Sequence, residues 1–254
     1  PLLFKSEMKN AALEAVNNNI EAEISLGDFH ISLFRHFPRL SIGFDELLVY
    51  GKKEFKADTV LAIDGFYGII SLKGLIQGKY SVYEIELVKP MLNLRMLENG
   101  KANWDILPEN SSDNRLASPP ENKEENNDES TLAFNINLQE FTIIDASVFY
   151  TDDQQGIELS ALGYYQDLRG DFSNDANILY AQSNIQSLSL IYNGIPMINN
   201  KGFMLEGNFD ADLSDNQFGL RDTKFEFGDL LLDLQALIQM EGDSLYVDMD
   251  LQTK

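Results

Sequence analysis

The feature of this sequence that most constrains its fold is the alternation of apolar and polar residues over long stretches. A period of two places successive side chains on opposite faces of a β-strand, so each stretch predicts a strand with one apolar and one polar face. The longest runs lie in 203–213 and 230–240, with others between 22 and 96, 134 and 150, and 245 and 251. Asn193-Gly194 follows one such run and is typical of a hairpin turn. The sequence therefore predicts an all-β protein, a mostly antiparallel curved sheet or meander.

Two segments interrupt this alternation. In residues 2–18, Phe4, Met8 and Ala11 fall at helical spacing, which predicts a short N-terminal helix. Residues 69–77 also lose the period of two, and we expect a short helix or turn there, lying over the sheet.

Residues 108–130 have a different composition, with only Leu116 and Ala117 as apolar residues. Such a segment cannot bury enough surface to offset its ordering entropy, so we predict a disordered acidic linker or loop. It separates a β region with a leading helix, residues 1–107, from a continuing β region, residues 131–254, which we expect to be truncated at its C-terminus. The two regions differ in charge, with 12 basic and 14 acidic residues in the first against 5 and 20 in the second.

Composition excludes several classes of protein. The chain has no cysteine, which rules out disulfides, thiolate nucleophiles and cysteine-based zinc sites. Its formal net charge of -22 argues against nucleic acid as a partner, because phosphate binding needs clustered Lys and Arg. No stretch reaches the roughly 18 apolar residues of a membrane-spanning helix, and no signal peptide is visible. Since the chain begins at Pro1 and ends just after a strand-like run, we expect a piece of a longer protein.

The candidate chemical sites are weak. No G-x-S-x-G, H-E-x-x-H or Walker A motif occurs, and carboxylate pairs carry little information in so acidic a chain. We predict no enzyme and no cofactor; a hydrolase using a carboxylate pair is a distant alternative. His30 and His36 would share one face of a regular strand, but without an ordered carboxylate beside them we expect surface histidines and no metal. The acidic run 210–215 lacks the central Gly and terminal Glu of a calcium loop.

Three segments resemble the N-terminal region of the AsmA family. They are Phe-Arg-His-Phe-Pro-Arg-Leu-Ser-Ile-Gly-Phe-Asp-Glu-Leu-Leu-Val-Tyr (34–50), residues 75–107 with Asn-Gly-Lys-Ala-Asn-Trp-Asp-Ile-Leu at their end, and Ile-Asp-Ala-Ser-Val-Phe-Tyr-Thr-Asp (144–152). The resemblance covers most of residues 1–152. The motif positions that we expect to be structural are Pro38, Pro90, Gly100, Asn103 and Trp104, with Trp104 anchored against the end of the sheet.

The resemblance implies a location and a function. Proteins of this family face the periplasm of double-membrane bacteria from an inner-membrane anchor, here an N-terminal helix absent from this chain. It also implies a chorein-like N-terminal region and an elongated curved sheet with an apolar hollow. The implied function is phospholipid transport between membranes or envelope maintenance, with phospholipid or membrane, and possible envelope proteins, as partners.

The apolar strand faces could line a lipid groove or fill a packed core. For a single strand, core packing is the commoner role of an apolar face. The groove hypothesis rests on Phe203, Leu205, Phe209, Leu213, Leu230, Leu232 and Leu234. The alternative is a structural scaffold or an assembly factor for outer-membrane proteins, with a packed core that binds no lipid. Alternation alone does not separate the two.

Overall fold

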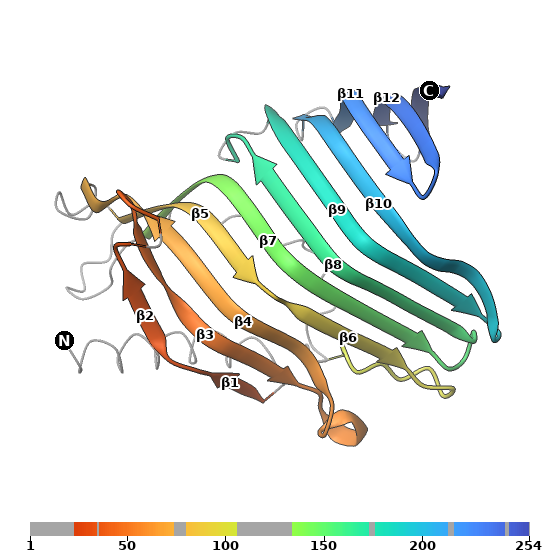
Figure 1. Cartoon of the computed structure of the whole chain (residues 1–254), viewed down its shortest axis with the longest axis horizontal. Helices are drawn as coiled ribbons and strands as arrows, with labels where there is room; N and C mark the ends of the chain where they lie inside the picture. The colour runs from red at the N-terminus through yellow and green to blue at the C-terminus, as the bar shows by residue number, and fades with distance from the viewer. Residues whose placement is uncertain are drawn as a thin grey trace.

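The computed structural model describes residues 23–34, 36–73, 80–105, 134–172, 176–212, 216–241 and 244–253. Every described strand belongs to one twisted sheet of 13 strands, which runs continuously from the N-terminal to the C-terminal strands (Figure 1). The predicted all-β class is therefore confirmed. The predicted N-terminal helix and the linker 108–130 lie outside the described residues.

The strands lengthen toward the middle of the chain. The first six are β1 (Ile24–Leu26), β2 (Phe29–Ser32), β3 (Leu40–Tyr50), β4 (Thr59–Ile70), β5 (Tyr80–Val88) and β6 (Met91–Met96), with a 3-10 turn, η1 (Lys53–Phe55), between β3 and β4. The remainder are β7 (Phe134–Asp152), β8 (Ile157–Arg169), β9 (Ala176–Tyr192), β10 (Ile195–Asp212), β11 (Gln217–Phe227), β12 (Leu230–Glu241) and β13 (Ser244–Thr253).

The sheet is mostly antiparallel but not a pure meander. Its main order is β1-β3-β4-β5-β7-β8-β9-β10-β11-β12-β13, with β2 paired to β3 and β6 paired to both β4 and β7. β5 and β6 lie one after the other between β4 and β7. Pro90, which has no backbone N–H to donate, separates them. Both pair with β7 in parallel. The expectation of a continuous meander is thus wrong at this one place. β7 begins beside the start of β5 and runs in the same direction as β5 and β6, so its pairing with them is parallel and not a hairpin.

The expected helix or turn over 69–77 is wrong at its start. β4 extends to Ile70, and Ile69 and Ile70 are 0% and 3% exposed. Their burial in the sheet overrides the local loss of alternation, because a strand buried on both faces does not alternate. Helical structure appears only at Leu72 and Lys73, and residues 74–77 are outside the described part of the chain.

β-Bulges keep apolar side chains on one face of the longest strands. Asp145 in β7 and Asp222 in β11 have positive φ angles of 56° and 50°, and the register with the neighbouring strand shifts at each. Gly163 in β8 has φ 64° at a further shift against β7. Each bulge inserts one residue, which reverses the alternation locally and increases the twist.

The well-sealed core lies in the N-terminal part. Its buried apolar side chains include Leu26, Phe29, Leu40, Val49 and Ile63, all at most 8% exposed. From β7 onward, the buried apolar residues in the described strands are the three alanines Ala146, Ala161 and Ala181. Large apolar side chains in the C-terminal strands are therefore less covered than those of the N-terminal strands.

A candidate apolar binding face

Strand register places a continuous set of apolar side chains on one face of β7–β13, because directly opposed residues in adjacent strands share a face. Leu205 in β10 lies opposite Ser183 in β9 and Phe225 in β11, and Phe225 lies opposite Leu232 in β12. We call this set the apolar face. Its larger members are Phe141, Ile143, Val148, Tyr150, Leu159, Leu168, Leu179, Ile185, Leu188, Leu190, Phe203, Leu205, Phe209, Phe218, Leu220, Phe225, Phe227, Leu230, Leu232, Leu234, Ile238, Leu245, Val247, Met249 and Leu251.

The apolar face is partly open to solvent over the C-terminal strands. Leu230, Met249 and Leu251 are 45%, 52% and 53% exposed, whereas Phe29 at the N-terminal end of the sheet is 3% exposed. All described strands belong to the same sheet, so no second sheet of described residues covers this face. Side chains of a packed core would be largely removed from water. The face is therefore an exposed apolar surface over β13 and at Leu230, and a half-buried one over β10 and at Leu232, Leu234 and Ile238 of β12.

The predicted groove residues come together on this face. Phe203, Leu205 and Phe209 alternate along β10, and Leu230, Leu232 and Leu234 alternate along β12. Leu213 lies outside the described residues.

The phenylalanines of β11 were missed by sequence reasoning. They lie between the two predicted runs, and the ring centroids of Phe203 and Phe225 are 5.5 Å apart in an edge-on contact. The bulge at Asp222 moves the apolar positions of β11 from even to odd numbers, which hides the alternation. The short pattern Phe225-Glu226-Phe227 was the available signal.

A hydrogen-bonded polar group interrupts the apolar face over β8 and β9. The Tyr164 hydroxyl donates to Gln166 Oε1 at 2.8 Å, and the Ser183 hydroxyl donates to the same oxygen. Gln166 Nε2 in turn donates to the backbone carbonyl of Gln182 at 3.3 Å. Burial raises the pKa of the Tyr164 phenol, so its hydroxyl stays a donor at neutral pH. Because these groups satisfy one another, they impose little desolvation cost on the sheet.

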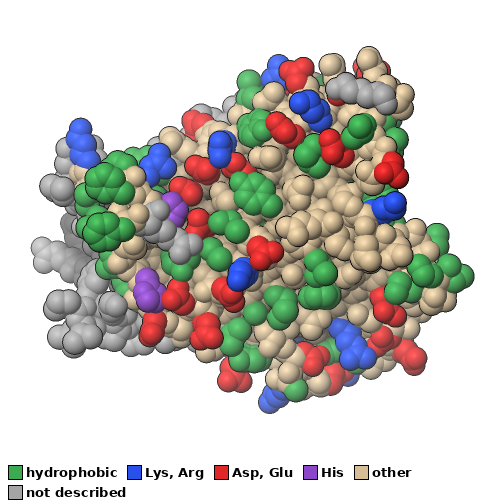
Figure 2. Space-filling model, in the orientation of Figure 1, with side chains coloured by type: hydrophobic (Ala, Val, Ile, Leu, Met, Phe, Trp, Pro, Cys, Tyr) green, Lys and Arg blue, Asp and Glu red, His purple; other side chains and the backbone are tan. Residues whose placement is uncertain are grey.

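The opposite, polar face carries a cluster of charged side chains. His36 Nε2 lies 3.4 Å from Glu86 Oε2, and an Arg39 guanidinium nitrogen lies 3.7 Å from Glu84 Oε2. Burial raises the pKa of the Glu84 carboxyl, and the charge of Glu140 raises it further, while His36 and Arg39 act in the opposite direction. Figure 2 shows the histidines on this face beside acidic side chains.

This cluster includes the three groups best placed to hold a metal ion among the described residues. Ligand atoms of His36, Glu84 and Glu86 lie within 4.8 Å of one another. The Arg39 guanidinium and the His36 imidazole already face Glu84 and Glu86, so side chains of the protein itself occupy the positions around these carboxylates. His30 belongs to a separate pair, with its Nε2 2.7 Å from Asp45 Oδ2, so the structure does not combine the two histidines. The expectation of surface histidines without a carboxylate beside them is wrong, since each has a carboxylate neighbour and the His36 side chain is only 19% exposed.

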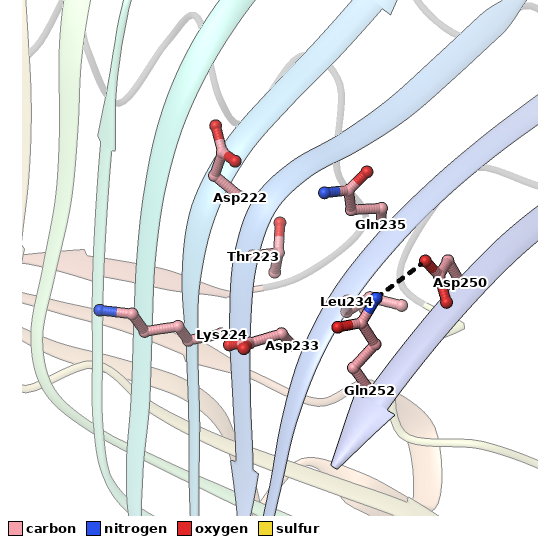
Figure 3. A pocket seen from close by; sticks show the side chains of 8 residues that line it. All are labelled: Asp222, Thr223, Lys224, Asp233, Leu234, Gln235, Asp250 and Gln252. Carbon is pink, nitrogen blue, oxygen red and sulfur yellow. Dashed lines mark hydrogen bonds between the residues drawn. The ribbon is translucent and has the colours of Figure 1, made fainter. Parts of the chain in front are cut away.

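A polar hollow lies over β11–β13. Lys224 and Asp233 are opposed in register, Asp233 is opposed to Gln252, and the Gln252 amide donates to Asp250 at 3.2 Å. Figure 3 shows these side chains around the hollow, with Asp222 on the bulge above them. Such cross-strand polar pairs are ordinary for a solvated strand surface, and we assign them no chemistry.

Asn103 and Trp104 fasten the loop after β6. Asn103 is 1% exposed; its Oδ1 accepts from the Arg95 backbone N–H at 2.9 Å and its Nδ2 donates to the Asn93 carbonyl at 2.8 Å. The Trp104 ring lies 5.9 Å from that of Tyr150 in β7, at the end of the sheet.

The other three motif positions lie in turns. Gly100 has φ 78° in the turn that precedes Asn103. Pro90 separates β5 from β6, and Pro38 lies between β2 and β3. These five positions shape connections, and none lies on the apolar face.

Comparisons with known proteins add no relative. The chain matches no protein-family model, and no curated protein matches it. Within the described residues, none of the helical segments is both long and apolar enough to cross a membrane.

Proposed function

We propose that the apolar face binds phospholipid acyl chains, and that the protein transports phospholipid or maintains the envelope from an inner-membrane anchor. The observation that supports this most is a contrast in burial along one sheet. The apolar face is more covered over β1–β4, where Phe29 and Leu40 are 3% and 5% exposed although Phe66 is 39% exposed, than over β12 and β13, where Leu230 and Leu251 are 45% and 53% exposed. Exposed apolar area of this extent favours an apolar ligand. The location and the family relationship rest on the resemblance of residues 34–50, 75–107 and 144–152 to AsmA proteins.

The energetics of lipid movement suit an open apolar surface. Each methylene moved from a bilayer into water costs about 0.8 kcal/mol, so an acyl chain of roughly sixteen carbons faces more than about 10 kcal/mol. A continuous apolar surface lowers this barrier by replacing lipid contacts with side-chain contacts. No bond is made or broken, and we propose no catalytic step.

The second candidate function is a scaffold or assembly factor that uses the same surface for a protein. Every residue of β13 is exposed, and Leu245, Val247, Met249 and Leu251 alternate along it. An exposed strand of this kind can pair with a strand of another protein.

Lipid extraction and mass spectrometry of the purified protein distinguish the two candidates. Lipid binding predicts phospholipid that stays with the protein through purification, and saturable displacement of a fluorescent fatty acid by unlabelled phospholipid. Lipid-free protein that also fails to bind the fluorescent fatty acid would refute the lipid proposal. It would leave the scaffold function as the better explanation of the exposed apolar face.

A further inference from the structure

The loop between β2 and β3 exposes aromatic side chains to an unusual extent. Phe34 is 92% exposed and Phe37 is 78% exposed, and the neighbouring Leu33 and Ile31 are 43% and 49% exposed. The upper left of Figure 2 shows hydrophobic side chains protruding beside the histidines and basic side chains of the polar face.

The side chains of His36 and Arg39 in this loop lie beside carboxylates of the sheet. His36 lies 3.4 Å from Glu86, Arg39 lies 3.7 Å from Glu84, and the Arg39 backbone N–H donates to the His36 carbonyl at 2.7 Å. Both glutamates are buried, at 8% and 7% exposed. The loop is therefore held to the sheet through its polar groups and presents its phenylalanines outward.

This arrangement reverses the usual distribution of side chains at a surface. Phenylalanine loses favourable burial when it stays in water, and two rings projecting from one tight turn gain nothing from the fold itself. The contacts of Arg39 with Glu84 and of His36 with Glu86 hold the turn against the sheet, so a partner that receives the rings need not order it first.

We propose that Phe34 and Phe37 dock the protein on a lipid bilayer by inserting their rings into its interfacial region. This inference rests on the proposed function, because a protein that takes up or delivers membrane phospholipid must reach a bilayer. Aromatic rings favour the bilayer interface, where apolar and wet environments meet.

Local charge and area favour a bilayer over a protein partner. Arg39, which is 47% exposed, and Lys73, also exposed, line a hollow at the base of the loop together with Pro38 and Tyr83. Lys73 and the exposed part of the Arg39 guanidinium can meet lipid phosphates, in a chain whose net charge is -22. A stable protein interface needs about 800 Å² per partner, far more than two side chains offer, whereas weak and reversible membrane contact needs only a small inserted apolar area together with attraction to anionic lipid.

Vesicle flotation of the whole chain tests the proposal. The probe is a set of vesicles of phosphatidylethanolamine and phosphatidylglycerol, compared with phosphatidylcholine alone. The double substitution Phe34→Ser/Phe37→Ser should lower the vesicle partition coefficient by about tenfold or more. The matched control is Ile195→Ser/Met197→Ser, which removes two apolar side chains that are each 62% exposed in the β9–β10 hairpin. The control should float as the wild type does.

A fluorescent variant reports insertion directly. Trp104 is the only tryptophan in the chain, so Phe37→Trp in a Trp104→Phe background places the single indole in the loop. Its emission should shift to the blue and be quenched by brominated lipid when vesicles are added. An indole that remains in water while the protein floats would overturn the proposal.

Fatty-acid displacement separates this inference from the proposed function. Phe34→Ser/Phe37→Ser should bind the fluorescent fatty acid as the wild type does, because the apolar face is unchanged. Three results would refute the loop as a bilayer contact. They are equal flotation of wild type and loop variant, no flotation of either, and self-association that depends on Phe34 and Phe37. The apolar face could still bind lipid in each of these cases.

Discussion

Replacing Leu205 with aspartate tests whether the apolar face is open or packed. Leu205 is half-buried in β10, between Ser183 and Phe225 in the neighbouring strands. A carboxylate at a half-buried position can reach water from the open side, so it loses only part of its solvation. We expect the free energy of unfolding to fall by about 1–3 kcal/mol, from lost apolar burial and partial desolvation. This is smaller than the 5–15 kcal/mol typical of a folded protein, so the variant should fold.

The same substitution should weaken lipid binding. If the carboxylate removes contact with two or three methylenes, the binding free energy falls by about 1.6–2.4 kcal/mol, at about 0.8 kcal/mol each. The dissociation constant then rises by about 15- to 60-fold. Displacement of a fluorescent fatty acid measures this change, and urea denaturation followed by circular dichroism measures stability.

Two asparagine variants serve as controls. Leu205→Asn adds polarity without charge, and should weaken binding with a smaller loss of stability. Met204→Asn changes the adjacent residue, which faces the polar side between Asn184 and Glu226, and should leave binding unchanged. Unfolding of Leu205→Asp would show a packed core. A folded Leu205→Asp variant with wild-type binding would show that the apolar face is not the lipid site.

Three further predictions concern stability. Asp167 is 2% exposed and lies 2.6 Å from the Arg169 guanidinium, so Arg169→Met leaves a buried carboxylate without its cation. The free energy of unfolding in urea titrations should fall by about 1–3 kcal/mol, a value reduced to allow for the solvent exposure of Arg169. Arg169→Lys should restore part of this loss. Asn103→Ala removes two part-buried hydrogen bonds to the backbone of Asn93 and Arg95 and should cost about 1–3 kcal/mol, seen as a lower Tm. An unchanged Tm would contradict the assigned bonds. Burial raises the pKa of the Glu84 carboxyl in the folded protein above its ordinary value of 4.5. The free energy of unfolding therefore falls as the pH rises from 4.5 through the raised pKa. The stability of Glu84→Gln relative to wild type should therefore increase from pH 4 to pH 7 in parallel denaturation curves, and a constant difference would refute this.

The sequence by itself determined the strands and their two faces. Alternation is a local property: side chains two residues apart must share a face, so the runs around Leu205 and Leu232 could be placed without knowing their neighbours. Such reasoning fails where one residue is inserted, as at Asp222, because a bulge exchanges the faces without changing the composition. It also fails at Ile69 and Ile70, where burial removes the need to alternate.

Only the tertiary structure decided which apolar side chains are covered. Phe29 and Leu251 belong to similar alternating segments, yet one is 3% and the other 53% exposed. Burial depends on what lies above a side chain, and those atoms come from distant parts of the chain. The parallel pairing of β5 and β6 with β7 is likewise non-local. In the same way, the exposure of Phe34 and Phe37 depends on distant residues, because His36 and Arg39 in the same loop contact Glu86 and Glu84 in β5.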